Sequence, residues 1–303
     1  MDKKEIQDYF IGILEEEEDV SAGIAAIRTL LTVLERDESE TVQELDSNLR
    51  AAGDAMRKTD HPGAAVRSGC ELFLRFITLA KLDTETFAEC KAIMLHRGKL
   101  FLKKLMEARG KVAKLASNFI IDGSRVLTHS HSRVVLQAMK EAAKANKRFD
   151  VYVTVSSPDN SGVLMSKKLR DLGIPVTVIL DSAVGYIMEQ VDLVMVGAEG
   201  VVESGGIINK VGSYTMALCA REMKKPFYVL CESFKFVRLY PLNQQDLPDE
   251  FKHPTSKLEN GKDLQEEHPL VDYTPPSYIS LLFTDLGILT PSAVSDELVK
   301  LYL

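Results

Sequence analysis

The 303-residue chain contains no tryptophan, and its four cysteines (Cys70, Cys90, Cys219 and Cys231) have no C-x-x-C spacing. Scattered cysteines of this kind fit a reducing compartment and are predicted to be small core hydrophobes. No apolar run approaches the roughly 20 residues that a membrane span needs. The N-terminus is charged from its second residue and has no signal-peptide core, so we expect a cytosolic protein without a membrane partner.

Several common functional signatures are also missing. The dinucleotide fingerprint G-x-G-x-x-G and the P-loop are absent, and Ser130 does not lie in a G-x-S-x-G elbow. The net charge of −7 makes the chain a poor non-specific nucleic-acid binder, so no direct nucleic-acid partner is expected. His129 and His131 form an H-x-H pair, but the other histidines have no ligand spacing, so we predict no metal site.

Apolar and charged residues are present in ordinary proportions, 45% and 27%, which predicts a globular protein with a real core. The length permits one large domain or two ordinary ones. Residues 1 to about 120 are predicted to form a helical domain, because apolar residues recur there at helical spacing, as in Ile24, Ile27, Leu31 and Leu34.

Two features of this helical domain have both a structural and a functional interpretation. Thr41-Val-Gln-Glu44 has the form of a capping box that starts a helix, and the same residues are a candidate partner surface. Residues 97–114 carry seven basic residues against a single acid, Glu107. Such a run is usually a solvated helix face, and the alternative is a docking face for an acidic or phosphorylated partner.

The pattern changes after Ile121, where Asp122-Gly123 predicts a turn. Short apolar runs then alternate with helical ones, with strands expected at 125–128, 151–155, 176–180, 193–196 and 227–231. This alternation indicates a parallel sheet covered on both faces, and right-handed crossovers then give a doubly wound, Rossmann-like domain over 121–303. Residues 238–276 are interpreted as a long polar insertion. The apolar end, 277–303, either completes the sheet or meets a partner.

The stretch from Asp192 to Leu218 organises this second domain. A buried strand breaks into a glycine-rich loop containing Gly197, Gly200, Gly205 and Gly206, and a helix is expected to begin near Gly212 and Ser213. The free N–H groups of such a helix start favour an anion, and Asn209 and Lys210 precede it. The alternative is a glycine-rich turn that only lets the helix pack on the sheet.

Ligands of an open parallel sheet bind outside the carboxyl ends of its strands. The residues that follow the predicted strands are polar: Thr128 to Arg133, Ser156-Ser157, Asp181-Ser182, Gly197 to Glu199, and Glu232 to Lys235. Together they combine hydroxyls, carboxylates and the cations Arg133, Lys210 and Lys235. This set suits a small phosphorylated polyol better than an apolar ligand.

Motifs along the whole chain resemble the initiation factor 2B alpha/beta/delta family. They are Ile27–Leu30, Glu71–Phe76, Val126–His129, Asp192–Glu199, Gly206–Gly212, Glu232–Phe236, Asp272–Pro276 and Leu289–Leu298. The same family includes isomerases that convert an aldose phosphate to a ketose phosphate. The resemblance implies that these enzymes carry a cysteine and an aspartate where this chain has Ser130 and Glu199.

Both replacements disfavour isomerase chemistry. A serine hydroxyl is a far weaker acid than a thiol, and a glutamate displaces the carboxylate by one methylene. The resemblance therefore implies a non-catalytic protein that requires no cofactor and keeps a pocket for a sugar phosphate or nucleoside monophosphate. The pocket residues expected are Thr128, His129, Ser130, Arg133, Gly197, Glu199, Asn209, Lys210 and Lys235.

The resemblance also implies partners. They are a second copy of the chain, the beta and delta subunits of the guanine nucleotide exchange factor for initiation factor 2, and the phosphorylated alpha subunit of initiation factor 2. The chain would be a regulatory subunit that bridges the others, with Thr41 and Glu44 as candidates for sensing the phosphorylated partner. The alternative function is a sugar-phosphate isomerase that uses Ser130 and Glu199 in modified roles.

Overall fold

A computed structural model describes residues 1–61, 63–78, 86–254 and 268–302. The chain divides into two compact units, and each combines distant segments. The first comprises Met1–Glu107, Asp249–His268 and Lys300–Leu303, and the second comprises Ala108–Pro248 and Pro269–Val299. The single boundary expected near residue 120 stays a prediction. No helix among the described residues is long and apolar enough to cross a membrane.

The first unit is helical, which confirms the helical N-terminal region expected from the sequence. Its helices are α1 (Lys3–Glu16), α2 (Ala22–Arg36), α3 (Val42–Arg57), α4 (Gly63–Thr78), most of α5 (Phe87–Ser117) and the short α10 (Asp249–Lys252). Large apolar side chains from α1 to α4 are completely buried, among them Phe10, Leu30, Leu49 and Phe73. These residues form the core that the helical spacing predicted.

The short helix α10 shows that part of the predicted insertion belongs to the helical unit. The side chain of Phe251 is only 5% exposed. The guanidinium of Arg67, on α4, lies 2.9 Å from the carboxylate of Glu250. Glycine is required at position 63, because a Cβ there would lie 2.9 Å from the Glu250 carbonyl oxygen. Residues 255–267 of that insertion lie outside the described residues.

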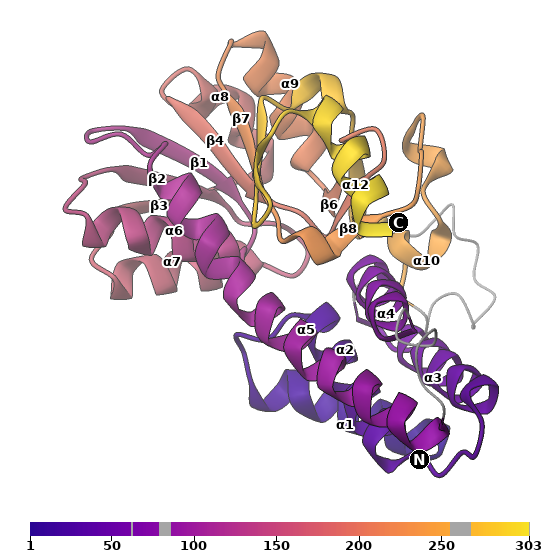
Figure 1. The fold of residues 1–303 in the computed structure, drawn as a ribbon. Coiled ribbons are helices and arrows are strands. Elements are labelled where there is room, and N and C mark those ends of the chain that lie inside the picture. The colour runs from indigo at the N-terminus through magenta and orange to yellow at the C-terminus, as the bar shows by residue number, and fades with distance from the viewer. Residues whose placement is uncertain (62, 79–85, 255–267, 303) are drawn as a thin grey trace. The chain divides into compact units, whose positions relative to one another are not determined.

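The second unit is built on a seven-stranded sheet (Figure 1). Its order is β11-β10-β7-β4-β1-β2-β3, and every pair is parallel except β10–β11. The strands are β1 (Arg125–His129), β2 (Asp150–Thr154), β3 (Val176–Ile179), β4 (Leu193–Gly197), β7 (Phe227–Leu230), β10 (Leu281–Thr284) and β11 (Gly287–Leu289). The mixed α/β class with a mostly parallel sheet is therefore confirmed.

Helices of the second unit lie between parallel strands of this sheet: α6 (Arg133–Lys144), α7 (Ser161–Asp171), α8 (Val184–Met188) and α9 (Ser213–Glu222). Helix α12 (Val294–Tyr302) follows the last strand, β11. Apolar side chains of α6, α7 and the last turns of α5 form one buried cluster with the central strands. The chain reverses its direction across the sheet after β3, so α8 and α9, which pack on each other, lie on the opposite face. Single-turn 3-10 helices occur at Asp181–Ala183, Ser233–Lys235, Gln244–Asp246, Pro276–Tyr278 and Pro291–Ala293.

A second, four-stranded sheet corrects the sequence interpretation. Its order is β8-β5-β6-β9, from β5 (Gly200–Val202), β6 (Ile207–Lys210), β8 (Phe236–Val237) and β9 (Val271–Thr274). The glycine-rich stretch was expected to be a loop, but most of it forms the β5–β6 hairpin. The supposed polar insertion supplies β9, which pairs with β6. Both segments form strands because their apolar residues, such as Ile207 and Val271, become buried.

Candidate functional site

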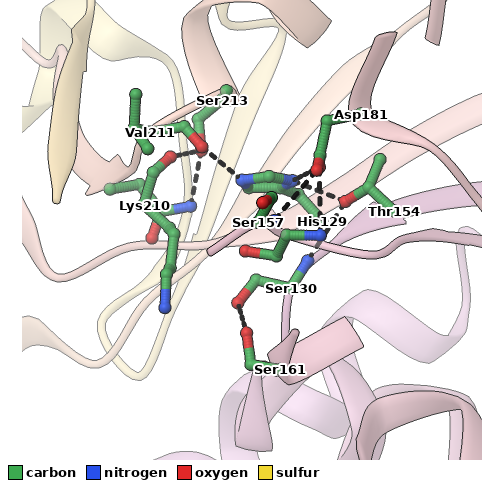
Figure 2. A network of polar contacts seen from close by, with 12 residues as sticks. His129, Ser130, Thr154, Ser157, Ser161, Asp181, Lys210, Val211 and Ser213 are labelled. Carbon is green, nitrogen blue, oxygen red and sulfur yellow. Dashed lines mark hydrogen bonds and ion pairs between the residues drawn. The ribbon is translucent and has the colours of Figure 1, made fainter. Parts of the chain in front are cut away.

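The predicted site residues follow β1 and β4, which are neighbours in the large sheet. From β1 the chain proceeds to β2, and from β4 it proceeds to β7 on the opposite side. This divergence is the topological switch point at which open parallel sheets bind ligands. Ser130 follows β1 directly and Glu199 lies just beyond β4. The polar network around the end of β1 is drawn in Figure 2.

His129 is buried at the end of β1, and both of its ring nitrogens have partners. Nε2 lies 2.8 Å from the carbonyl oxygen of Val211, so this nitrogen carries a proton and donates it. Nδ1 lies 2.6 Å from the Thr154 hydroxyl. Burial lowers the pKa of His129, although the Val211 carbonyl and Asp181 act in the opposite direction. The imidazole is therefore neutral, with its proton on Nε2, and its Nδ1 accepts a hydrogen bond from the Thr154 hydroxyl.

Ser130 has a hydroxyl partner rather than a base. Its Oγ lies 2.6 Å from Oγ of Ser161, the first residue of α7. Its main-chain N–H donates to the Thr154 hydroxyl at 3.4 Å, and its φ of 61° is in the left-handed region. The adjacent Thr128 is completely buried, and its Oγ1 has no hydrogen-bond partner among the described residues.

Asp181 holds the loop that follows β2. Its two carboxylate oxygens accept the main-chain N–H groups of Ser156 at 3.0 Å and Ser157 at 2.9 Å. The nearer carboxylate oxygen lies 4.0 Å from Nδ1 of His129. Figure 2 shows Asp181, Thr154 and Ser157 gathered around the imidazole. The ends of β1, β2 and β3 are therefore joined by one hydrogen-bonded group.

Asn209 and Lys210 lie at the end of β6, as expected just before α9. The amide of Asn209 donates to Oγ of Ser213 at 2.8 Å, and that hydroxyl donates to the Lys210 carbonyl at 2.7 Å. The ammonium of Lys210 forms an ion pair with Asp159, which lies in the loop before α7. Burial lowers the pKa of Lys210.

The start of α9 already has an anionic partner within the chain. One carboxylate oxygen of Asp272, on β9, accepts the N–H of Gly212 at 2.7 Å and that of Tyr214 at 3.0 Å. Burial raises the pKa of Asp272 to about 7, against the opposing effect of these two donors. The helix start predicted as an anion site thus binds the protein's own carboxylate, since β9 places Asp272 beside β6.

Glu199 and Lys235 belong to a second group of charges. Lys235 lies 2.9 Å from the carboxylate of Glu232 and donates to the Ala198 carbonyl at 3.1 Å. Burial alone would raise the pKa of Glu232, but Lys235 and Arg109 outweigh it and hold that pKa at about 2. Burial raises the pKa of Glu199 to about 7, and Lys235 only partly opposes this. Lys235 is thus committed mainly to Glu232.

The remaining predicted residues have distinct places. A Cβ on Gly197 would lie 2.5 Å from Oγ of Ser132, so this glycine allows β4 to approach the start of α6. Arg133 is the half-buried first residue of α6. Thr41 and Glu44 lie in the helical unit, where the Thr41 hydroxyl accepts the N–H of Glu44 and starts α3, as the capping pattern predicted.

Sequence reasoning did not identify Asp159, Ser161 or Asp272 as parts of the site. Nothing in the local sequence indicated that Asp159 contacts Lys210, which lies 51 positions away. Metal ligation has no support within the described ranges, where no three histidine, cysteine or acidic side chains cluster suitably. Cys70, Cys90 and Cys231 are buried free thiols, as predicted, and Cys219 is partly exposed.

The chemistry available at Ser130 is limited by these contacts. His129 has no unoccupied ring nitrogen with which to accept a proton from Ser130. The hydroxyl of Ser161, the group that Ser130 does contact, is no stronger a base than Ser130 itself. The arrangement offers hydroxyls, main-chain donors and a lysine, which are groups that bind an anion, rather than an activated nucleophile.

Comparisons with known proteins show which proteins the chain is similar to. The model of the initiation factor 2 subunit family matches residues 15–291. The chain is 43% identical to translation initiation factor eIF2B subunit alpha of Caenorhabditis elegans, over 97% of both chains. It is 44% identical to that of Dictyostelium discoideum, over 97% of this chain and 95% of the relative. A ribose 1,5-bisphosphate isomerase of Archaeoglobus fulgidus is 29% identical over 86% of this chain and 82% of its own.

Solved structures have the same fold. Translation initiation factor eIF-2B of Pyrococcus horikoshii superposes with a TM-score of 0.73 at 26% identity, over 95% of this chain and 98% of that one. A chain of the tetrameric eIF2B-beta2-delta2 complex of C. thermophilum gives a TM-score of 0.78 over 100% of this chain and 96% of that chain, at 20% identity. This second similarity concerns the fold alone.

Proposed function

The chain belongs to the initiation factor 2 subunit family, and from this membership we propose that it is a non-catalytic, alpha-type regulatory subunit of the guanine nucleotide exchange factor for translation initiation factor 2. The relatives named as eIF2B alpha subunits match it along almost its whole length. The geometric observation that carries the non-catalytic part is the state of His129, whose ring nitrogens are both engaged beside a hydroxyl-bonded Ser130.

The pocket at the ends of β1 and β6 is proposed to bind a sugar phosphate or a nucleoside monophosphate. Lys210 and Arg133 supply positive charge, Asn209 and Ser130 supply polar groups, and the buried hydroxyl of Thr128 has no hydrogen-bond partner among the residues that the structure describes. The remaining proposed contacts are His129, Gly197, Glu199 and Lys235. No cofactor is required for this role, because the ligand stabilises or regulates the subunit and is not transformed.

The ligand proposal is tested by calorimetric titration of the purified chain with ribose 5-phosphate and with AMP. We expect saturable binding of at least one of them, and loss of that binding in Lys210→Met, because the ammonium is the charge that a phosphate would meet. Melting curves of the variant verify that it is folded. The proposed pocket would be refuted if neither ligand produced heat of binding at a protein concentration near 100 times the expected dissociation constant.

The assembly proposal concerns partners. We propose a homodimer that joins the beta and delta subunits and contributes, through Thr41 and Glu44 on α3, to sensing of the phosphorylated alpha subunit of initiation factor 2. Molar mass measured alone and with the two subunits tests the first part: a dimer that unites them is expected, and a chain that ignores them contradicts bridging. Glu44→Lys tests the second part, since unchanged regulation with lower stability would assign Glu44 to capping alone.

A sugar-phosphate isomerase is the second candidate, and one observation favours it. The carboxyl of Glu199 has a pKa of about 7, where a proton carrier works best near neutral pH. An assay of ribose 1,5-bisphosphate conversion separates the two functions. We expect no turnover by the natural chain, because the Ser130 hydroxyl contacts another hydroxyl, that of Ser161, and not a base. Measurable turnover that is lost in Glu199→Gln would favour the isomerase.

A further inference from the structure

We propose that Asp159 is an internal competitor of the phosphate ligand: its carboxylate occupies Lys210 in the unliganded pocket, and a phosphate group has to displace it. The inference rests on the proposed ligand pocket and specifies how that pocket selects its ligand. It concerns one ion pair, between the end of β6 and the loop that precedes α7.

The contacts of Asp159 resemble those that a phosphate oxygen would make. One carboxylate oxygen pairs with the ammonium of Lys210, and the other accepts the main-chain N–H of Ser161 at 3.1 Å. The hydroxyls of Ser161 and Ser130 lie beside this N–H, 2.6 Å from each other. An ammonium, a main-chain N–H and hydroxyls are the usual donors to phosphate, and here a carboxylate already accepts from two of them.

Exposure indicates that this pair separates readily, in contrast to the neighbouring one. The side chain of Asp159 is 45% exposed, whereas that of Glu232, the partner of Lys235, is only 2% exposed. Exposed ion pairs contribute little to stability because solvent screens them, while breaking a buried pair leaves an uncompensated charge. Of these two lysines, Lys210 is therefore the one that a ligand can recruit, and Lys235 is retained by Glu232.

A selectivity follows from this competition. A phosphate monoester carries close to two negative charges at neutral pH and three acceptor oxygens. It therefore binds to the same donors more strongly than a carboxylate does. A sugar without phosphate, or with a carboxylate in its place, gains too little from Lys210 to displace Asp159. We therefore expect ribose 5-phosphate to bind and ribose and ribonate not to bind.

The test is calorimetric titration of ribose 5-phosphate into the full chain and into Asp159→Asn. Asparagine keeps an acceptor for the Ser161 N–H but removes the charge that competes for Lys210. We expect about fivefold tighter binding, the upper end for an exposed ion pair. Asp171→Asn is the matched control, because it removes one exposed charge at the other end of α7 and should change affinity less than twofold.

Each outcome has a defined meaning. Equal affinity of the natural chain and Asp159→Asn would overturn the competition while leaving the pocket intact, and so would an equal gain in Asp171→Asn. No binding by any variant would overturn the pocket itself. If Asp159→Asn proves unfolded, Asp159→Ser gives the same comparison, since serine also keeps an acceptor without charge. Asp159→Glu, which retains the charge, is expected to stay within twofold of the natural affinity.

Discussion

At the scale of single residues, the site is distinguished by carboxyl groups whose surroundings move their pKa values in opposite directions. Lys235 and Arg109 outweigh the effect of burial and hold the pKa of Glu232 at about 2. Burial raises the pKa of Glu199 to about 7, and no side-chain hydrogen bond to Glu199 occurs within the described part of the chain. The first carboxylate is therefore stabilised as an anion, and the second is stabilised as a neutral acid.

The shift of Glu199 predicts a specific pH dependence of stability. In the unfolded chain its pKa is near 4.5, and in the folded chain it is about 7. The folded state therefore binds the extra proton between these values, so the contribution of Glu199 to stability falls as the pH rises from about 4.5 to 7. Glu199→Gln is expected to be more stable than the natural chain at pH 8 and equally stable at pH 5.

Urea denaturation at pH 5, 6, 7 and 8 measures this difference. Glu203→Gln is a useful control, since it makes the same change of side chain on the same glycine-rich stretch. A stability difference between Glu199→Gln and the natural chain that does not change with pH would contradict the assignment. Asp272, whose pKa burial also raises to about 7, should leave the Glu199→Gln variant with a residual pH dependence of the same sign.

Which site residues could be predicted depended on their distance in sequence from a strand end. Ser130 and Glu199 follow predicted strands and Lys210 precedes a predicted helix, so local patterns were enough to name all three as candidates. Asp159 and Asp272 could not be assigned, because their partners Lys210 and Gly212 lie 51 and 60 positions away. Such pairings are decided by how the second sheet packs, which no local pattern records.

At the scale of elements, most of the large sheet was predictable and the small one was not. Each of the strands β1, β2 and β3 is a short run rich in apolar residues that is followed by a helix, and this pattern has one simple interpretation. β5, β6, β8 and β9 are only two to four residues long and are separated by glycines or polar segments. Their strand structure comes from pairing between distant segments, so tertiary context overrode the local turn signals.

The start of α7 supplies a test of element packing. Gly162 lies so close to the end of β2 that an added Cβ would overlap the Thr154 carbonyl oxygen. Gly162→Ala is therefore expected to destabilise the chain by at least about 3 kcal/mol, because main chain has to move. Gly110→Ala, in α5, is the matched control: a Cβ there meets nothing within 4 Å, and alanine should stabilise this helix by about 1 kcal/mol.

Thermal and chemical denaturation of both variants give these values. A Gly162→Ala chain as stable as the natural protein would show that the loop between β2 and α7 moves aside easily. That result would also bear on Asp159, which lies in the same loop, since an adaptable loop would make its carboxylate easier to displace.

At the scale of the whole molecule, each compact unit is assembled from segments that are distant in sequence. The helical unit includes residues 249–268, which follow strand β8 of the small sheet in the sequence. The spacing of apolar residues changes only once along the chain, near residue 120, and this change predicts two domains that are each continuous in sequence. The return of the chain to the helical unit depends on a few contacts of α10, such as that of Arg67 with Glu250, that composition does not reveal.

This return predicts that a residue late in the sequence stabilises an early helix. Phe251 is buried, and one of its ring carbons lies 3.5 Å from the position of a Cβ on Gly63. Phe251→Ala is expected to cost about 3 kcal/mol, the lower end for a buried phenylalanine. Hydrogen exchange of the α4 amides should accelerate accordingly. Glu250→Gln, which removes only an exposed ion pair, should change stability by less than about 1 kcal/mol; α4 amides unaffected by Phe251→Ala would contradict the prediction.

The carboxylate at the start of α9 also has a consequence for synthesis of the chain. Gly212 and Tyr214 leave the ribosome about 60 residues before Asp272, which accepts their N–H groups. At roughly 5–20 residues per second, the delay is about 3–12 s. During that interval β6 lacks its neighbour β9, and its unpaired edge is open to association with other chains. The nascent protein is therefore exposed to aggregation through the edge of β6 until β9 (Val271–Thr274) has been synthesised.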